Sequence, residues 1–193
     1  YATLYELIDG GSDLVDKYES RSDKQYLTPA VSFDNLSNAE AIRVGYMMLY
    51  EHPELYYLNT VIKIDSSEGD SGKTIKLGVY PDFKTGEARS EYSSDIADKI
   101  DWYLAQVTAD EAVDKELQIH DLICENVSYK KANYNQSCAS AFLEEQTVCA
   151  GYSEAFALLC YASGIPAISI TSAEHEWNEV LLDGYWYAVD VTW

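Results

Sequence analysis

Helical and alternating spacings of apolar residues both occur along this chain, and their order indicates a fold class. Helices are predicted from apolar spacing or capping signals at residues 2–18, 37–51, 94–107, 108–127, 141–145 and 149–163. Strands are predicted at residues 60–64, 74–80, 167–171, 177–182 and 185–191. Because helices dominate the first part and strands end the chain, we expect an α+β fold with an antiparallel sheet.

Capping signals mark where two of these helices begin. Ser37-Asn38-Ala39-Glu40 and Thr108-Ala109-Asp110-Glu111 each place a hydroxyl three residues before a glutamate, which is the pattern of a capping box. The first helix is expected to end before Pro53.

Cys149 stands at the start of the most apolar helical pattern. Phe156, Leu159 and their neighbours recur at helical intervals, and Gly164 with Pro166 gives a stop signal. The positive end of a helix dipole favours an anion, so a thiol placed there is a candidate thiolate. The amides of the same helical turn are candidate donors to an oxyanion.

The last strands are predicted to form a hairpin around Asp183-Gly184. An Asp-Gly pair between β-rich runs is a strong signal for a two-residue turn. Counting outward from that turn, His175 and Asp190 project from one face as diagonal neighbours, roughly 8 Å apart in backbone position. A slip of one residue would place them on opposite faces, so the pairing depends on this turn. Cys149, His175 and Asp190 are therefore candidates for a nucleophile, a base and an orienting carboxylate.

Composition limits the partners and the architecture. With 193 residues we expect one domain, in which a helical and hairpin region, 1–110, packs on a core, 111–193. The net charge of −20 argues against nucleic acid or an anionic membrane as a partner. We find no apolar run of membrane-spanning length and see no signal peptide, and from the start at Tyr1 we expect a trimmed mature segment.

The four cysteines do not suggest a disulfide scaffold or a metal site. No Cys-x-x-Cys motif and no histidine pair at ligand spacing occurs, so we expect neither a metal nor an organic cofactor. Cys124 and Cys160 lie in apolar helical patterns and are expected in the core, whereas Cys138 lies in a polar, loop-like stretch. A Cys124–Cys138 bridge is an open alternative. His120 is interpreted as a structural residue of its helix.

Four short motifs together resemble the bacterial branch of the transglutaminase-like superfamily. The members of this superfamily are papain-like thiol enzymes. The four motifs are Val148-Cys149-Ala150-Gly151-Tyr152, His175-x-Trp177-Asn178-x-Val180, Leu182-Asp183-Gly184-x-Trp186-Tyr187 and Val189-Asp190-Val191-Thr192-Trp193. The resemblance is strong from about residue 116 to the end, and residues 50–57 are similar to the region upstream of the core in secreted Gram-positive members. Relatives commonly continue past the Thr-Trp pair, so we expect either a longer natural chain or an unusually terminal last strand.

The resemblance implies a fold, an activity and a set of site residues. It implies a papain-like core whose nucleophile helix packs on the antiparallel sheet, with Cys149 as nucleophile, His175 as general base and acid, and Asp190 as the orienting carboxylate. Gln146, Tyr152, Trp177 and Asn178 are expected in the cleft or behind the triad. We expect a secreted or cell-surface enzyme that hydrolyses amide bonds of a protein or peptide substrate, including a substrate associated with the cell wall. Protein cross-linking through glutamine and a non-catalytic binding module remain alternatives.

Overall fold

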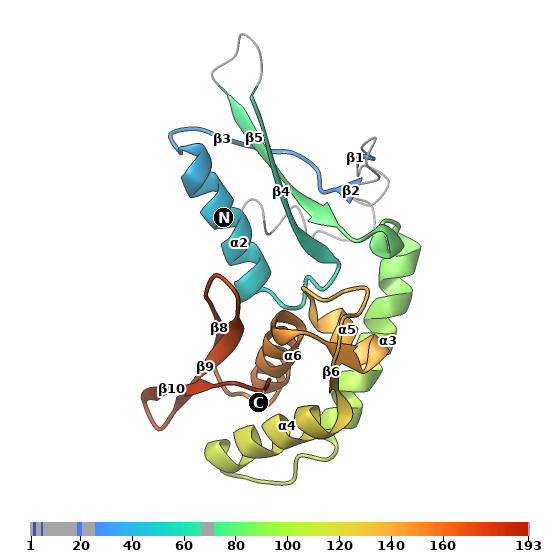
Figure 1. Ribbon diagram of the computed structural model, residues 1–193, viewed down its shortest axis with the longest axis vertical. Helices are drawn as coiled ribbons and strands as arrows, with labels where there is room; N and C mark the ends of the chain where they lie inside the picture. Colours follow the sequence, from blue (N-terminus) through green and yellow to red (C-terminus); the bar gives the residue numbers. More distant parts are fainter. Residues whose placement is uncertain (1, 3–4, 6–18, 21–25, 67–71, 193) are drawn as a thin grey trace. The chain divides into compact units, whose positions relative to one another are not determined.

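The computed structural model describes residues 2, 5, 19–20, 26–66 and 72–192 (Figure 1). The chain divides into two compact units, residues 1–92 and 93–193, and the division falls within one helix. The expected division into 1–110 and 111–193 stays a prediction. Apart from residues 2 and 5, the helix predicted at residues 2–18 lies outside the described residues.

The first unit contains a sheet of short and long strands around a central hairpin. Its strands are β1 (Glu19–Ser20), β2 (Tyr26–Leu27), β3 (Val31–Phe33), β4 (Leu58–Ser66) and β5 (Lys73–Val79). All four pairings are antiparallel, and β2, β3 and β4 each pair with β5. The two strands predicted from alternation at residues 60–64 and 74–80 therefore correspond to the β4–β5 hairpin.

Helix α2 (Asn38–Glu51) packs on β4 and β5 of this sheet and begins at the predicted capping box. The amide of Glu40 donates to Ser37 Oγ over 3.3 Å, and the amide of Ser37 donates to Glu40 Oε2 over 2.8 Å. This reciprocal pair satisfies two amides that the helix itself leaves without partners. A short 3-10 turn, η2 (Pro81–Phe83), follows the sheet.

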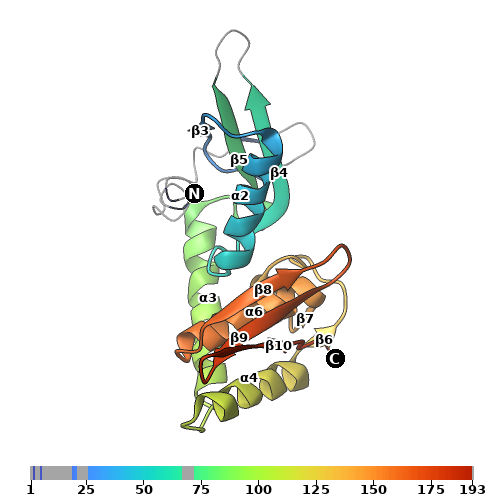
Figure 2. The same cartoon turned by 90° about the vertical axis from the view of Figure 1, so that its left-hand side faces the viewer.

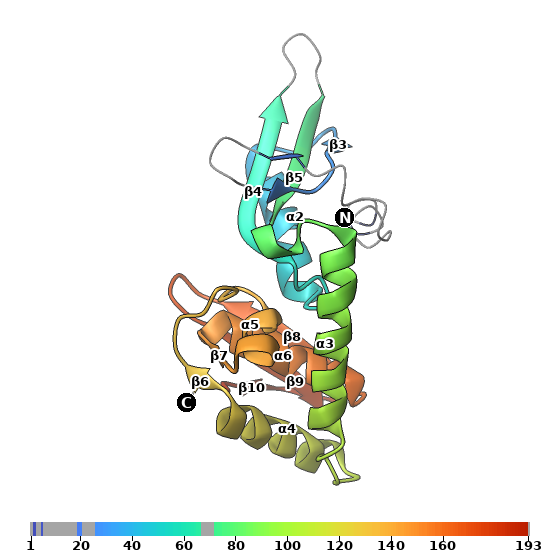
Figure 3. The same cartoon turned by 90° about the vertical axis from the view of Figure 1, so that its right-hand side faces the viewer.

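The second unit surrounds one apolar helix with helices and a three-stranded sheet (Figures 2 and 3). Its elements are the end of α3 (Gly86–Leu104), then α4 (Ala112–Asn126), β6 (Ser128–Tyr129), α5 (Cys138–Glu144), β7 (Gln146–Thr147), α6 (Cys149–Ala162), β8 (Ala167–Thr171), β9 (Glu176–Leu182) and β10 (Tyr185–Val189). The sheet has the order β10-β9-β8 and is antiparallel, whereas β6 and β7 form a short parallel pair. The predicted α+β class is confirmed.

Helix α6 forms the core of this unit. It packs against α4, α5, β8 and β9, and Phe156, Leu159 and Cys160 are fully buried. The helix ends where the stop signal predicts, because Gly164 has a φ of 79° that L side chains rarely adopt. The amide of Ile165 then donates to the carbonyl of Cys160 over 2.8 Å, which is the long bond of a Schellman motif.

Three helix boundaries differ from the predictions, and at two of them a side chain that was not predicted makes the cap. Helix α3 begins eight residues before the predicted residue 94, since Thr85 Oγ1 accepts from the amide of Ala88 over 3.2 Å. The capping box predicted at Thr108 does not form, since the amide of Thr108 donates instead to Gln118 Oε1 over 2.8 Å and α4 begins at Ala112. Helix α5 begins at Cys138 because Ser137 caps it.

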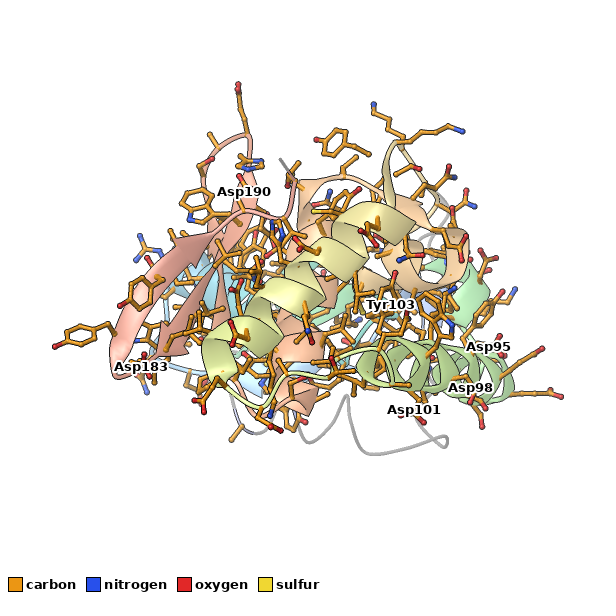
Figure 4. The ribbon with its side chains drawn as sticks, turned by 90° about the horizontal axis from the view of Figure 1, so that it is seen from below. Asp95, Asp98, Asp101, Tyr103, Asp183 and Asp190 are labelled. Atoms are coloured by element: carbon orange, nitrogen blue, oxygen red, sulfur yellow. The ribbon has the colours of Figure 1, made fainter. Side chains whose placement is uncertain are left out.

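Helix α3 carries a row of acidic residues on its exposed face. Asp95, Asp98 and Asp101 follow one another along α3 and are exposed, whereas Tyr103 on the same helix is buried (Figure 4). Within the described ranges, no helix combines the length and the apolar character that crossing a bilayer requires.

Candidate active site

The β9–β10 hairpin brings His175 and Asp190 together. Asp183 and Gly184 have φ values of 51° and 83°, as a two-residue turn of type I′ requires. Tyr185 pairs with Leu182 and Val189 with Asn178, which is the register predicted from the sequence. Asp183 and Asp190 lie at opposite ends of the second strand, one in the turn and one at the base of the hairpin (Figure 4). At that base, His175 Nε2 donates to Asp190 Oδ2 across 2.7 Å.

Asp190 is held as a carboxylate by its hydrogen bonds. Burial raises the pKa of this carboxyl, but the hydrogen bonds from His175 and Thr192 outweigh burial and bring the pKa below its usual value. The backbone amide of Thr192 donates to Asp190 Oδ1 over 3.0 Å, so each carboxylate oxygen has a donor. Each of the two side chains in the His175–Asp190 pair is 30% exposed, which leaves the pair reachable from solvent.

His175 is also oriented by its own backbone and by an aromatic neighbour. Its amide donates to Ser172 Oγ over 3.1 Å, and its carbonyl accepts from the amide of Ser172 over 2.8 Å. The ring of Trp177, two residues further along the chain, stacks on the imidazole with centroids 6.0 Å apart and planes 20° apart. The imidazole is thus fixed by a tight turn on one side and an indole on the other.

Cys149 is the first residue of α6, as predicted. The residue before it, Val148, is the N-cap and has no side chain that could accept from the first-turn amides. Those amides and the helix dipole favour negative charge at this end of the helix. Cys149 is half-buried and free of any disulfide.

The surroundings of Gly151, two residues after Cys149, leave no space for a side chain. A Cβ at Gly151 would overlap Thr147 Oγ1 and would lie 2.7 Å from Ser140 Oγ and 2.9 Å from the carbonyl of Ser137. These atoms belong to β7, to α5 and to the N-cap of α5, so the first turn of α6 lies directly against them. The two hydroxyls are themselves 2.5 Å apart and hydrogen-bonded.

The helix that carries Cys149 is joined to the strand that follows His175. Ser153 lies one helical turn after Cys149, and its carbonyl accepts from Asn178 Nδ2 over 3.1 Å. Ser153 Oγ donates to the carbonyl of Trp177 over 3.1 Å. Asn178 is fully buried, and its Oδ1 has no hydrogen-bond partner among the described residues. These bonds fix β9 on α6 close to both candidate residues.

Glu176 is the buried carboxyl of this region, and we did not predict it. Its side chain lies near the hydroxyls of Ser153 and Ser169, and Oε1 has no hydrogen-bond partner among the described residues. Burial raises the pKa of Glu176 to about 7, although the two hydroxyls act in the opposite direction. The alternation of β9 was the available signal, since Asn178, Val180 and Leu182 point inward and Glu176 continues their row.

The remaining predicted cleft residues have different surroundings. Gln146 is half-buried in β7, three residues before Cys149. Tyr152 is only 4% exposed, its hydroxyl donates to the carbonyl of Val127, and its ring stacks on the exposed Tyr129. The roles expected of Gln146, Tyr152, Trp177 and Asn178 stay predictions.

Two expectations about cysteines are wrong. Cys124 is exposed rather than in the core, and its thiol donates to the carbonyl of Val191 over 3.4 Å. Cys138 is buried as the first residue of α5 rather than lying in a loop. The Cys124–Cys138 alternative is wrong as well, since both are free thiols. Cys160 is buried, as expected.

The other thiols and His120 differ chemically from the candidate site. Burial, followed by the charges of Asp121 and Glu125, raises the pKa of Cys124. Burial also raises the pKa of Cys160. His120 Nδ1 lies 3.0 Å from Asp121 Oδ1, and its Nε2 lies 3.9 Å from Cys124 Sγ. Among the described residues, no group of three or more His, Cys, Asp or Glu side chains could hold a metal ion.

Comparison with known proteins relates this region to a family. Residues 101–191 match the family model of the transglutaminase-like superfamily. This matched stretch, a transglutaminase-like core by its similarity, includes α4, α5, α6 and the three-stranded sheet, and it contains Cys149, His175 and Asp190.

Proteins that are similar in sequence or structure carry the names of a peptidase, a TGase and a cysteine protease. The chain is 28% identical over 133 residues to the human kyphoscoliosis peptidase, a match that covers 50% of this chain and 20% of that protein. The chain thus spans about a fifth of the length of the curated relative that it matches. A solved structure named as a TGase has 16% identity, a TM-score of 0.44 and coverage of 84% of this chain and 50% of its own. A candidate cysteine protease from Cytophaga hutchinsonii has 15% identity, a TM-score of 0.43 and coverage of 89% and 68%.

Proposed function

We propose that the transglutaminase-like core is a thiol enzyme that cleaves amide bonds, with Cys149 as nucleophile, His175 as general base and acid, and Asp190 as the orienting carboxylate. The observation that carries the proposal is the hydrogen bond of 2.7 Å between His175 Nε2 and Asp190 Oδ2. With Nε2 directed to the carboxylate, we assign Nδ1 to the thiol. A carboxylate behind the imidazole fixes its tautomer and stabilises its charged form.

In the first half of the proposed reaction, His175 takes the proton of Cys149. The thiolate attacks the carbonyl carbon of the substrate amide and forms a carbon–sulfur bond, while the carbonyl oxygen becomes an oxyanion. Amides of the first turn of α6 and the side chain of Gln146 are the proposed donors to that oxyanion. The carbon–nitrogen bond then breaks as His175 returns its proton to the leaving amine, which leaves a thioester.

In the second half, an incoming nucleophile resolves the thioester. We propose water, from which His175 takes a proton as the oxygen attacks, so that a carboxylic acid leaves and the thiol is restored. Water requires no second binding site, whereas transfer requires one for an acceptor amine. We propose a protein or peptide substrate outside the cell, including cell-wall material, which the resemblance to secreted members of the superfamily supports.

The first test is alkylation of each cysteine across pH, located by mass spectrometry. Cys149 is expected to react rapidly at pH near 6, and His175→Ala is expected to slow it by about tenfold or more. His120→Ala is the matched control, because His120 lies beside the exposed thiol of Cys124. Labelling of Cys149 no faster than that of Cys124 would contradict the proposal and favour a non-catalytic binding module.

The second test separates hydrolysis from cross-linking. The protein is incubated with a library of peptides that contain glutamine, together with a labelled primary amine. Free acid products without amine incorporation are expected. Incorporation of the amine at glutamine would instead establish a γ-glutamyl transferase that uses the same three residues.

A further inference from the structure

Glu176 lies where the two elements of the proposed site meet. It follows His175 directly, it is 6% exposed, and its carboxyl lies near Ser153 of α6 and Ser169 of β8. Ser153 is one helical turn from Cys149, so Glu176 connects the strand of the candidate base with the helix of the candidate nucleophile. A buried carboxylate would be costly here, because one of its oxygens has no hydrogen-bond partner among the described residues.

The hydroxyl protons of Ser153 and Ser169 are both used in hydrogen bonds to other groups. Ser153 Oγ donates to the carbonyl of Trp177 over 3.1 Å, because that carbonyl can only accept. The bond of 2.9 Å between the two hydroxyls therefore uses the proton of Ser169. Neither serine has a second proton for the nearby carboxyl of Glu176. A proton on Glu176 supplies a third donor to the network.

We propose that Glu176 is held in its neutral form and, as a hydrogen-bond donor to the Ser153–Ser169 pair, positions the strand of His175 on the helix of Cys149. This inference rests on the proposed function, because the positioning matters for the reaction of those two residues. Glu176 is a positioning residue, and it touches neither substrate nor the reacting atoms. Its side chain lies on the inward face of β9, opposite to the face of His175 and Trp177.

Few other charged groups lie on the elements that pack around Glu176. Strand β8 has no titratable residue. On α6, the carboxylate of Glu154 is directed to the amide of Cys138 in α5, at 2.9 Å. On β9, Glu179 alternates to the other face. The protonation of Glu176 is therefore governed by burial and the two hydroxyls, and its raised pKa of about 7 agrees with the neutral form below that pH.

The proposal predicts that ionisation of Glu176 loosens the site. Above pH about 7 the network loses its third proton and gains a buried negative charge, so β9 shifts relative to Ser153. Misplacement of a catalytic group by about 1 Å can reduce rates by about a hundredfold. The reactivity of Cys149 that depends on His175 is thus expected to fall as Glu176 ionises.

The test is a double-mutant cycle between Glu176 and His175, read by alkylation of Cys149 at pH 6 in the full chain. Glu176→Ala is expected to slow alkylation about tenfold when His175 is present and to have no effect in the His175→Ala background. Glu176→Gln, which is neutral and can donate, is expected to keep the wild-type rate. In wild type, the part of the alkylation rate that depends on His175 is expected to be lost above pH about 7. In Glu176→Gln, whose side chain cannot ionise, this loss is expected only at higher pH. Glu179→Gln is the matched control on the opposite face of β9.

Two further measurements keep the test decisive. The infrared carbonyl band of a protonated carboxyl is expected at pH 6 in wild type and is lost in Glu176→Gln; identical spectra would overturn the proposal. If Glu176→Ala does not fold, Ser169→Ala removes one hydroxyl of the network and is expected to slow alkylation in the same direction. Equal slowing by Glu176→Ala with and without His175 would also overturn it.

The outcomes distinguish this proposal from the proposed function. If His175→Ala leaves the alkylation of Cys149 unchanged, the proposed function is wrong, whatever the infrared spectrum shows. If His175→Ala slows alkylation but Glu176→Ala does not, only the positioning role of Glu176 is wrong.

Discussion

At the scale of single residues, the charge of Asp190 decides how His175 is held. The carboxylate accepts from His175 and from the amide of Thr192, and these bonds bring its pKa below the usual value. A carboxyl with a lowered pKa in the folded state stabilises the fold above its unfolded pKa of about 3.9, and this stabilisation is lost as the pH falls through the lower folded value. The pair is therefore expected to remain ionic in mildly acidic solution.

Asp190→Asn tests this charge without changing the size of the side chain. We expect the alkylation of Cys149 at pH 6, and any peptide turnover, to fall by about a hundredfold or more, because the imidazolium loses its stabilising partner. Rates are measured from pH 4 to 8, with thermal unfolding as a check on the fold. Asp183→Asn in the turn of the same hairpin is the control and is expected to leave the rates unchanged.

A second residue, Tyr103, tests how the core tolerates a polar atom. The side chain is 1% exposed and packs edge-on against Phe142, and its hydroxyl has no hydrogen-bond partner among the described residues. Burial, with the nearby charge of Glu145, raises the pKa of Tyr103 to about 12. Since an unpaired buried hydroxyl costs about 1–3 kcal/mol, Tyr103→Phe is expected to leave the free energy of unfolding unchanged or to raise it by about 1 kcal/mol. A loss of stability in urea denaturation would show that the hydroxyl is bonded.

At the scale of elements, the close approach of α5 and β7 to α6 depends on Gly151. Gly151→Ala is expected to lower the free energy of unfolding by about 2 kcal/mol or more, because the new Cβ would overlap Thr147 Oγ1 and Ser140 Oγ. Gly164→Ala is a matched control, since a Cβ there meets no atom within 4 Å and adds only the backbone strain of a positive φ. Denaturant unfolding of both variants measures the difference. Equal losses would mean that space at Gly151 is not limiting.

Elements whose signals are local were predictable from the sequence. The β9–β10 register follows from Asp183-Gly184, because a two-residue turn determines every pair of the hairpin, and with it the face shared by His175 and Asp190. The capping box at Ser37 and the stop at Gly164 are local in the same way. The helix start and the hairpin register made Cys149, His175 and Asp190 candidates, and the family resemblance assigned a role to each of them.

Features that depend on distant contacts were not predictable. The capping box predicted at Thr108 is replaced by a bond from its amide to the side chain of Gln118, ten residues away. Cys124 occupies a helical position that looks apolar in sequence, but its thiol faces the carbonyl of Val191 near the end of the chain. Glu176 was missed because an acidic residue beside a candidate histidine suggests solvent, and only the packing of β9 on α6 makes it buried.

At the scale of the whole molecule, the buried carboxyl of Glu176 links folding stability to pH. Its pKa rises from 4.5 to about 7 on folding, so between these values the folded state binds more protons than the unfolded state. The stabilisation is fully present below pH about 4.5 and is lost as the pH rises through about 7. The shift corresponds to about 3 kcal/mol in the free energy of unfolding.

Glu176→Gln is expected to remove this part of the pH dependence. The difference in unfolding free energy between the variant and wild type should rise by about 2.5 kcal/mol in favour of the variant between pH 5 and pH 8. Urea denaturation at several pH values measures it, and Glu179→Gln controls for the loss of one charge from a molecule of net charge −20. Parallel curves for wild type and Glu176→Gln would show that Glu176 ionises as readily in the folded protein as in water.

The stacking of Trp177 on His175 gives the protein an optical signal of its own. The two rings are 6.0 Å apart and nearly parallel, so a protonated imidazole lies against the electron-rich face of the indole. Such a contact quenches indole fluorescence, and emission is therefore expected to increase as His175 loses its proton. Titration of wild type against Trp177→Phe would isolate this signal, and its absence in His175→Ala would assign it. Binding of a substrate beside His175 could then be followed in real time, without a label and without turnover.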